Sequence, residues 1–256
     1  MALVVFFATA AWYSLPAPAQ PYPTKPIRLI TAEVGGGSDF TSRLISQRLT
    51  ESLGQQIVVD NRTGGVIIGD IASKAQPDGY TLMLYSSSLW LMPYLRTQVP
   101  YRMEQFAPVI YISASPLLLV VHPSVQAKST EELIALAKAK PGELNYASGP
   151  LGASPHLSGE LFKYMTGTNI VHIPFKGAGP GTLAIMSNEI DMMSANPGVF
   201  MPHIKTGRIR AIGTSSRARL AILPDVPTYS EMGFPGYYFS SWYGLVAPAR
   251  TSPAII

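Results

Sequence analysis

The chain has 256 residues, 47% hydrophobic and 13% charged, which at roughly 100–200 residues per domain predicts one large domain or two modest ones. The absence of cysteine excludes disulfides, cysteine-ligated zinc, iron–sulfur clusters and a thiol nucleophile. The 19 Lys and Arg outnumber the 15 Asp and Glu, which gives a net charge of +4. This charge mildly favours anionic ligands and is too small to indicate a nucleic-acid partner.

The apolar run at the N-terminus is typical of an export signal. Residues 2–12 (ALVVFFATAAW) carry no charge, and the run is shorter than the about 20 residues that a membrane-spanning helix needs. Ala17-Pro18-Ala19 then matches the small-x-small pattern of a signal-peptidase site, although no Lys or Arg precedes the run. A buried strand is the alternative, and the four prolines between positions 16 and 23 argue against it. We predict that residues 1–19 are a signal peptide.

From Ile27 onward, short apolar runs alternate with amphipathic stretches. The expected strands are 27–30, 57–59, 81–85, 117–121, 144–147, 170–173, 190–193 and 209–214. The first expected helix begins near Ser38 and ends before Gly54, the second covers 67–75, and the third runs from a capping box at Ser129 to Lys140. Two more are expected to begin at Pro155 and at Pro180, and a last one to end at Lys205. Strands that alternate with helices predict an α/β fold with parallel sheets.

The chain is expected to divide into two α/β lobes. A boundary lies near Val121-His122-Pro123, and the run 242–247 (WYGLVA) is suited to a second strand that returns to the first unit. We therefore predict lobe 1 from 22–121 plus 241–256 and lobe 2 from 122–240. Two lobes joined by two crossing strands enclose a cleft, which is where such folds usually bind ligands.

Three loops of one kind join strands to helices in this pattern. They are Gly35-Gly36-Gly37-Ser38-Asp39, the segment 148–155 (SGPLGASP) with Ser154 as the expected N-cap and Pro155 at N1, and Lys176-Gly177-Ala178-Gly179-Pro180-Gly181. Each exposes backbone N–H groups at a helix N-terminus, where the helix dipole favours negative charge. Ordinary turn chemistry explains any one loop, but three at the carboxyl ends of strands predict a trap for a carboxylate or phosphate.

Signatures of catalysis, nucleotide binding and metal binding are absent from the sequence. There is no G-x-S-x-G elbow, no P-loop and no G-x-G-x-x-G. The four histidines, His122, His156, His172 and His203, are dispersed and form no H-E-x-x-H motif. His156 lies beside the predicted trap, where it either contacts the ligand or caps or packs against the helix. Lys176 either pairs with an anion or is simply solvated. Asp39 lies in the first turn of a helix, where a negative charge is favourable to the dipole without any ligand. We expect no catalysis, no metal and no cofactor.

These loops belong to a longer series of segments in a fixed order. The segments are YPTKPIRLI, GGGSDFTSRL, LGQQIVVDNRTGG, AQPDGYTL, ELNYASGPLGASPHLSGELF, IVHIPFKGAGP, PHIKTGRIRAIGTSS, LPDVPTYSEMGFPGY and SSWYGLVAPA. In this series the chain resembles the solute-binding receptors of tripartite tricarboxylate transporters, also called Bug-type receptors, from Tyr22 to about Pro248.

The resemblance implies a periplasmic binding protein whose two α/β lobes close on a small carboxylated solute and then dock on the membrane subunits of a tripartite permease. It implies a monomer in the periplasm, with a sensor kinase as an alternative partner and an enzyme of related fold as a further alternative. By position, it implies ligand contacts from Val34, Gly35, Gly36, Gly37, Ser38 and Asp39, from Ser86 and Ser87, from Ser148, Gly149, Pro150, Gly152, Ala153, Ser154 and His156, and from Phe175, Lys176, Gly177, Ala195 and Asn196.

Departures from the family pattern bear on the ligand. Glu33 replaces a small residue before the first glycines, which predicts repulsion of simple polycarboxylates or preference for a solute that also carries an amine, unless its side chain points to solvent. Pro150-Leu151 and Ala195 replace polar residues, which predicts a drier pocket suited to an aromatic or aliphatic acid. The family also continues past Pro248 with helices of lobe 1, so a C-terminally short chain is expected to be less stable.

Overall fold

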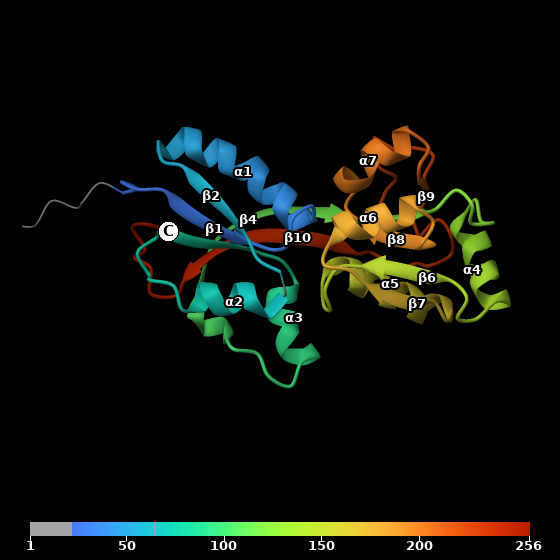
Figure 1. Cartoon of the computed structure of the whole chain (residues 1–256), viewed down its shortest axis with the longest axis horizontal. Helices are drawn as coiled ribbons and strands as arrows, with labels where there is room; N and C mark the ends of the chain where they lie inside the picture. The colour runs from blue at the N-terminus through green and yellow to red at the C-terminus, as the bar shows by residue number, and fades with distance from the viewer. Residues whose placement is uncertain (1–21, 64) are drawn as a thin grey trace, which may run out of the picture.

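The computed structural model describes residues 22–63 and 65–256, and Figure 1 shows two α/β lobes side by side along the long axis. The predicted signal peptide lies outside the described residues. Among those described, no helix is long and apolar enough to cross a membrane.

Lobe 1 is built on a mixed five-stranded sheet with the order β2-β1-β3-β10-β4. Its strands are β1 (Ile27–Thr31), β2 (Ile57–Asn61), β3 (Thr81–Tyr85), β4 (Phe106–Pro116) and β10 (Ser240–Pro248), and its helices are α1 (Gly37–Leu53), α2 (Gly65–Ser73) and α3 (Ser88–Leu95), with a short 3₁₀ turn η1 (Met103–Gln105). β1 pairs in parallel with β2 and β3, whereas β10 is antiparallel to β3 and β4. Gly54 ends α1 as predicted, since its φ of 66° is the left-handed conformation that glycine tolerates.

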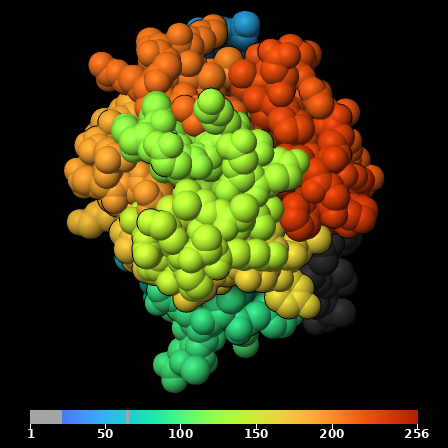
Figure 2. All heavy atoms as spheres, turned by 90° about the vertical axis from the view of Figure 1, so that its right-hand side faces the viewer, coloured from blue at the N-terminus to red at the C-terminus, as the bar shows by residue number. Residues whose placement is uncertain are grey.

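Lobe 2 repeats this plan with the sheet order β7-β6-β8-β5-β9. Its strands are β5 (Leu118–Val121), β6 (Asn145–Ser148), β7 (Val171–Pro174), β8 (Met192–Ala195) and β9 (Arg210–Thr214), and its helices are α4 (Thr130–Ala139), α5 (Ser154–Thr166), α6 (Ala178–Met186) and α7 (Pro197–Lys205). β5 and β8 are buried along their whole length because helices cover both faces of this sheet. Figure 2 looks onto the outer end of lobe 2, where α4 (yellow-green) lies beside the segment that follows β9 (red-orange).

Two crossing segments connect the lobes, and Ser215 forms hydrogen bonds with both of them. The Leu117 N–H donates to the hydroxyl of Ser215 at 2.8 Å, and that hydroxyl donates to the carbonyl of Phe239 at 2.5 Å. The backbone N–H of Ser215 donates to the Leu117 carbonyl at 3.0 Å, and its carbonyl accepts from the Phe239 N–H at 3.2 Å. Ser215 is 1% exposed, so these bonds are shielded from water and fix the spacing of the two crossing segments.

The α/β architecture with two lobes confirms the predicted fold class, and the differences have local causes. β4 and α3 were not expected: β4 is a half-exposed edge strand that contains Pro108, and α3 contains Pro93, so neither shows a clean hydrophobic period. β5 pairs within the second sheet, although the expected boundary after Val121 grouped it with lobe 1. The other lobe boundaries stay predictions.

Candidate ligand-binding cleft

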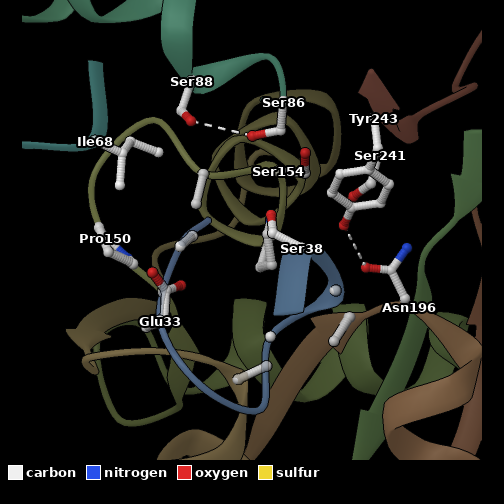
Figure 3. A pocket seen from close by; sticks show the side chains of 18 of the residues that line it. Glu33, Ser38, Ile68, Ser86, Ser88, Pro150, Ser154, Asn196, Ser241 and Tyr243 are labelled. Carbon is white, nitrogen blue, oxygen red and sulfur yellow. Dashed lines mark hydrogen bonds between the residues drawn. The ribbon is translucent and has the colours of Figure 1, made fainter. Parts of the chain in front are cut away.

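A small cavity of about 60 Å³ lies between the two lobes (Figure 3). Lobe 1 lines it with Ala32, Glu33, Gly36, Gly37, Ser38, Ile68, Ser86, Ser88, Ser241 and Tyr243, and lobe 2 with Gly149, Pro150, Leu151, Ala153, Ser154, Pro155, Ala178, Ala195 and Asn196. Small and apolar residues dominate both walls, with serine hydroxyls between them. The cavity is therefore suited to a small organic molecule that both lobes contact at once.

Five helices direct their N-termini toward this cavity. Residues of the first turn or the N-cap of α1, α3, α5, α6 and α7 are part of its lining or directly adjoin it. None of these five termini has a side-chain cap, whereas α4 on the outside of lobe 2 is capped by Ser129, whose hydroxyl accepts the N–H of Glu132 at 3.2 Å. The N–H groups that capping would satisfy are thus left at the cavity, together with the positive ends of five helix dipoles.

The start of α5 differs by one residue from expectation, and this leaves a serine in the cleft. Ala153 is the N-cap, so Ser154 is the first helical residue and does not cap the helix. Its hydroxyl instead lies 3.4 Å from that of Ser87 in lobe 1, and both side chains are buried. Ser154 therefore contributes to a contact between the lobes at the edge of the cavity.

Tyr243 and Asn196 join the lobes on the other side of the cavity. The Tyr243 hydroxyl donates to Asn196 Oδ1 at 3.1 Å, as the dashed line in Figure 3 shows. Burial raises the pKa of Tyr243 to about 12, so this hydroxyl keeps its proton at physiological pH. Beside them, Asn196 Nδ2 and the hydroxyl of Ser241 are buried without a hydrogen-bond partner among the described residues. Because buried polar groups normally find partners, these two are available to a ligand.

Asp39 holds the first glycine loop in shape. Its carboxylate accepts the Gly35 N–H at 3.0 Å, Arg43 Nε at 2.9 Å and Asn61 Nδ2 at 2.9 Å. Burial by itself would raise the pKa of Asp39, but these hydrogen bonds outweigh it and lower the pKa. Gly35 has a φ of 79°, a conformation that the missing side chain permits. Asp39 thus positions the loop, and its side chain lies outside the cavity.

Two histidines support the second loop from beneath. The Gly152 N–H donates to His156 Nδ1 at 3.3 Å, and the Ser148 hydroxyl lies 2.7 Å from His172 Nε2. The imidazole rings are 4.9 Å apart, and burial is the main cause that lowers the pKa of both. His156 is 8% exposed and does not belong to the residues that line the cavity.

Half of the residues expected from the family pattern come together at this cavity. Gly36, Gly37, Ser38, Ser86, Gly149, Pro150, Ala153, Ser154, Ala195 and Asn196 line it. Val34, Gly35 and Asp39 instead line a neighbouring groove between α1 and α6, Ser87 and Ser148 are buried behind the wall, Phe175 packs against the lobe 2 core, and Lys176 is exposed. Gly152, His156 and Gly177 adjoin the lining without belonging to it. Their part in binding stays a prediction.

Several lining residues were not expected as ligand contacts, most clearly Ser241 and Tyr243. Both belong to β10, where alternate side chains point to the same face. This two-residue alternation could have identified both residues from the sequence, because the returning strand 242–247 was itself predicted. Ile68 lies within α2 and Ser88 begins α3, and the approach of these two helices to the cleft depends on tertiary packing alone.

Comparison with known proteins now assigns the family. The sequence model of the tripartite tricarboxylate transporter family receptor (TctC) matches residues 41–256. The chain belongs to this receptor family. Protein BugT of Bordetella pertussis is 38% identical over 266 residues, covering 100% of this chain and 80% of the relative.

Solved structures of the same kind superpose closely on this receptor. Rpa4515 of R. palustris with adipate is 33% identical with a TM-score of 0.86, covering 92% of this chain and 80% of that one. MatC from Rhodopseudomonas palustris with bound malate is 27% identical with a TM-score of 0.86, covering 91% of this chain and 81% of that one. Both neighbours hold carboxylates.

Proposed function

We propose that this receptor captures a small carboxylated solute in the cleft between its lobes and delivers it to the membrane subunits of a tripartite permease. In this proposal residues 1–19 direct export to the periplasm, where the monomer works without catalysis or cofactor. The observation that carries the proposal is the convergence of five uncapped helix N-termini on one cavity. Adipate and malate in the two neighbours support the same ligand class.

The carboxylate is bound by backbone N–H groups in this proposal. A carboxylate at a helix N-terminus accepts two or three N–H bonds and is stabilised by the dipole, with no cationic side chain needed. Ser38, Ser86 and Ser88 add hydroxyl donors from lobe 1. Ile68 and Leu151 provide apolar contact for the carbon skeleton, which favours an aliphatic or aromatic acid over a highly hydroxylated one.

Closure follows from contacts that one ligand makes with both lobes. A ligand shifts an open–closed equilibrium only by the difference between its affinities for the two states. The helices that meet at the cavity come from both lobes: α1 and α3 from lobe 1, and α5, α6 and α7 from lobe 2. A carboxylate that accepts N–H bonds from both sets is bound fully only when the lobes are closed, and the closed form is what a permease can recognise.

The test measures the bound solute and then blocks one helix terminus. Native mass spectrometry of the receptor purified from the periplasm identifies any co-purifying acid, and isothermal titration follows adipate, malate, citrate and benzoate. Ala153→Asp adds a carboxylate at the N-cap of α5, which occupies the N–H groups and repels the ligand, so we expect affinity to fall by about tenfold or more. Ser129→Asp makes the same change at α4 and is the matched control.

Retained affinity in Ala153→Asp, or equal loss in Ser129→Asp, would show that helix N-termini do not hold the ligand. A receptor that binds no carboxylate would refute the proposal altogether. Turnover of a bound solute would favour an enzyme of related fold, and capture of a sensor kinase in place of permease subunits would favour the sensing alternative.

A further inference from the structure

Glu33 brings a negative charge into a cavity built to bind anions. It is the only charged residue among the described residues that line the cavity. It follows β1, in the loop that leads to α1, and Figure 3 shows its carboxylate beside Pro150, away from Tyr243 and Asn196. One side of the cavity therefore carries a carboxylate, whereas the side lined by Tyr243 and Asn196 carries only uncharged polar groups.

The side chain of Glu33 crosses from lobe 1 to lobe 2 and lies against two glycines. A Cβ placed on Gly177 would overlap Glu33 Cγ, and one placed on Gly149 would lie 3.5 Å from Glu33 Oε1. Gly177 has extended backbone angles that any residue adopts, so close approach of the glutamate, and not backbone conformation, is what requires a glycine there. The glutamate is thus packed into the cleft and does not extend into solvent.

No positively charged side chain among the described residues pairs with this carboxylate. Glu33 takes part in none of the ion pairs between described residues, and no side chain of the described part donates a hydrogen bond to it. Burial raises the pKa of Glu33, and only its own backbone N–H offsets that rise. The nearest lysine in sequence to its lobe 2 contacts, Lys176, is exposed and makes no ion pair among the described residues.

We propose that Glu33 is the counter-ion for a cationic nitrogen of the bound solute, which selects compounds that carry both an amine and a carboxylate. This rests on the proposed function, since the uncapped helix N-termini hold the carboxylate of the same molecule. A second carboxylate at this side of the cavity would lie beside Glu33 and be repelled, whereas an ammonium group forms a charge-assisted hydrogen bond with it. The cleft then offers helix N–H groups from both lobes and, beside the N-caps of α1 and α6, a single carboxylate.

The experiment compares ligands that differ only at one end. Isothermal titration at pH 8 measures 4-aminobutanoate, 5-aminopentanoate and 6-aminohexanoate against the diacids of equal length, and against the corresponding alkylamines without a carboxylate. The wild type should bind the best amino acid at least about tenfold more tightly than its matched diacid, and Glu33→Gln should abolish or reverse that preference. Glu33→Asp keeps the charge and should keep the preference. Glu131→Gln, an exposed glutamate of α4, is the control.

Each outcome separates the two proposals. Diacids that bind as tightly as amino acids in the wild type, with Glu33→Gln unchanged, overturn the role of Glu33 and leave carboxylate capture standing. Amines that bind as tightly as amino acids support Glu33 and refute carboxylate capture. Diacid binding that strengthens on acidification and survives Glu33→Gln shows that a protonated Glu33 donates to the ligand, which overturns the counter-ion role. A co-purified solute without a basic nitrogen, or failure of every probe to bind, also overturns it.

Stability of the ligand-free protein provides a second readout. A carboxyl whose pKa is raised by folding costs stability as pH rises through its titration, so Glu33→Gln should melt at a higher temperature than the wild type at pH 8 and at a similar one near pH 4. A lower melting temperature at pH 8 would mean that the carboxylate has a stabilising partner within the protein, and would overturn the proposal.

Discussion

Gly37→Ala tests whether the Tyr243–Asn196 contact controls closure of the cleft. Gly37 begins α1, and a Cβ built on it would overlap both the Tyr243 hydroxyl and Asn196 Oδ1. Tyr243 belongs to lobe 1, so its overlap is present whether the cleft is open or closed. Asn196 belongs to lobe 2, so its overlap arises only when the lobes meet. The overlap with Asn196 should therefore disfavour the closed form specifically, whereas the overlap with Tyr243 should lower the stability of lobe 1 in both forms.

The expected magnitude follows from these two contacts. Forcing a methyl group into a packed site costs about 1–3 kcal/mol, and separating the Tyr243–Asn196 hydrogen bond costs about 1 kcal/mol more. If about 2 kcal/mol of that sum falls on the closed state alone, ligand affinity drops by about 30-fold. Tyr243→Phe removes one overlapping atom, so Gly37→Ala combined with Tyr243→Phe should lose less affinity than the two single changes predict together.

Isothermal titration with the tightest-binding probe measures affinity, and a thermal melt measures stability. Small-angle scattering with and without that probe measures closure of the lobes. Gly198→Ala is the matched control, because the added Cβ would lie 3.9 Å from the Phe40 ring, an ordinary contact. We expect Gly37→Ala to stay more extended with the probe than wild type and Gly198→Ala. Unchanged affinity and compaction in Gly37→Ala would refute the reasoning, and a loss of melting temperature with unchanged affinity would place the whole cost in lobe 1.

Three further changes test the supports of the cleft. Ser215→Ala leaves the buried Leu117 N–H without its acceptor, so urea unfolding should show a loss of about 1–3 kcal/mol, and no loss would mean that water replaces the hydroxyl. Asp39→Asn weakens the hydrogen bond from the Gly35 N–H. Because folding lowers the pKa of Asp39, the variant should be less stable than the wild type at pH 7, and this difference in stability should vanish well below pH 3.8. The pKa of His156 is lowered by burial, so wild-type stability should fall as pH drops below about 6.5, and His156→Gln should flatten that slope in melts between pH 7 and pH 5.

Local signals in the sequence were sufficient for most of the elements and for the family. Ser129 and Gly54 begin and end helices as expected, because caps and left-handed glycines act within one turn of the chain. β3 spans the expected residues because its hydrophobic run is bounded by a turn. The capping box at Ser129 is only half formed, since the Glu132 carboxylate accepts from the Lys128 N–H at 2.6 Å, one residue earlier than the pattern predicts.

The sequence by itself determined which loops carry exposed N–H groups, because glycines and helix starts are local features. Only the tertiary structure decided that the N-termini of α1, α5 and α6 share one cavity with those of α3 and α7, and that His156 packs beneath the loop. It also decided between the two positions open to Glu33, placing the side chain across the cleft against Gly177 and not in solvent. The physical reason is that the site is made where two lobes meet, and the hydrogen bonds across that junction join residues 47 and 67 positions apart that no local pattern relates.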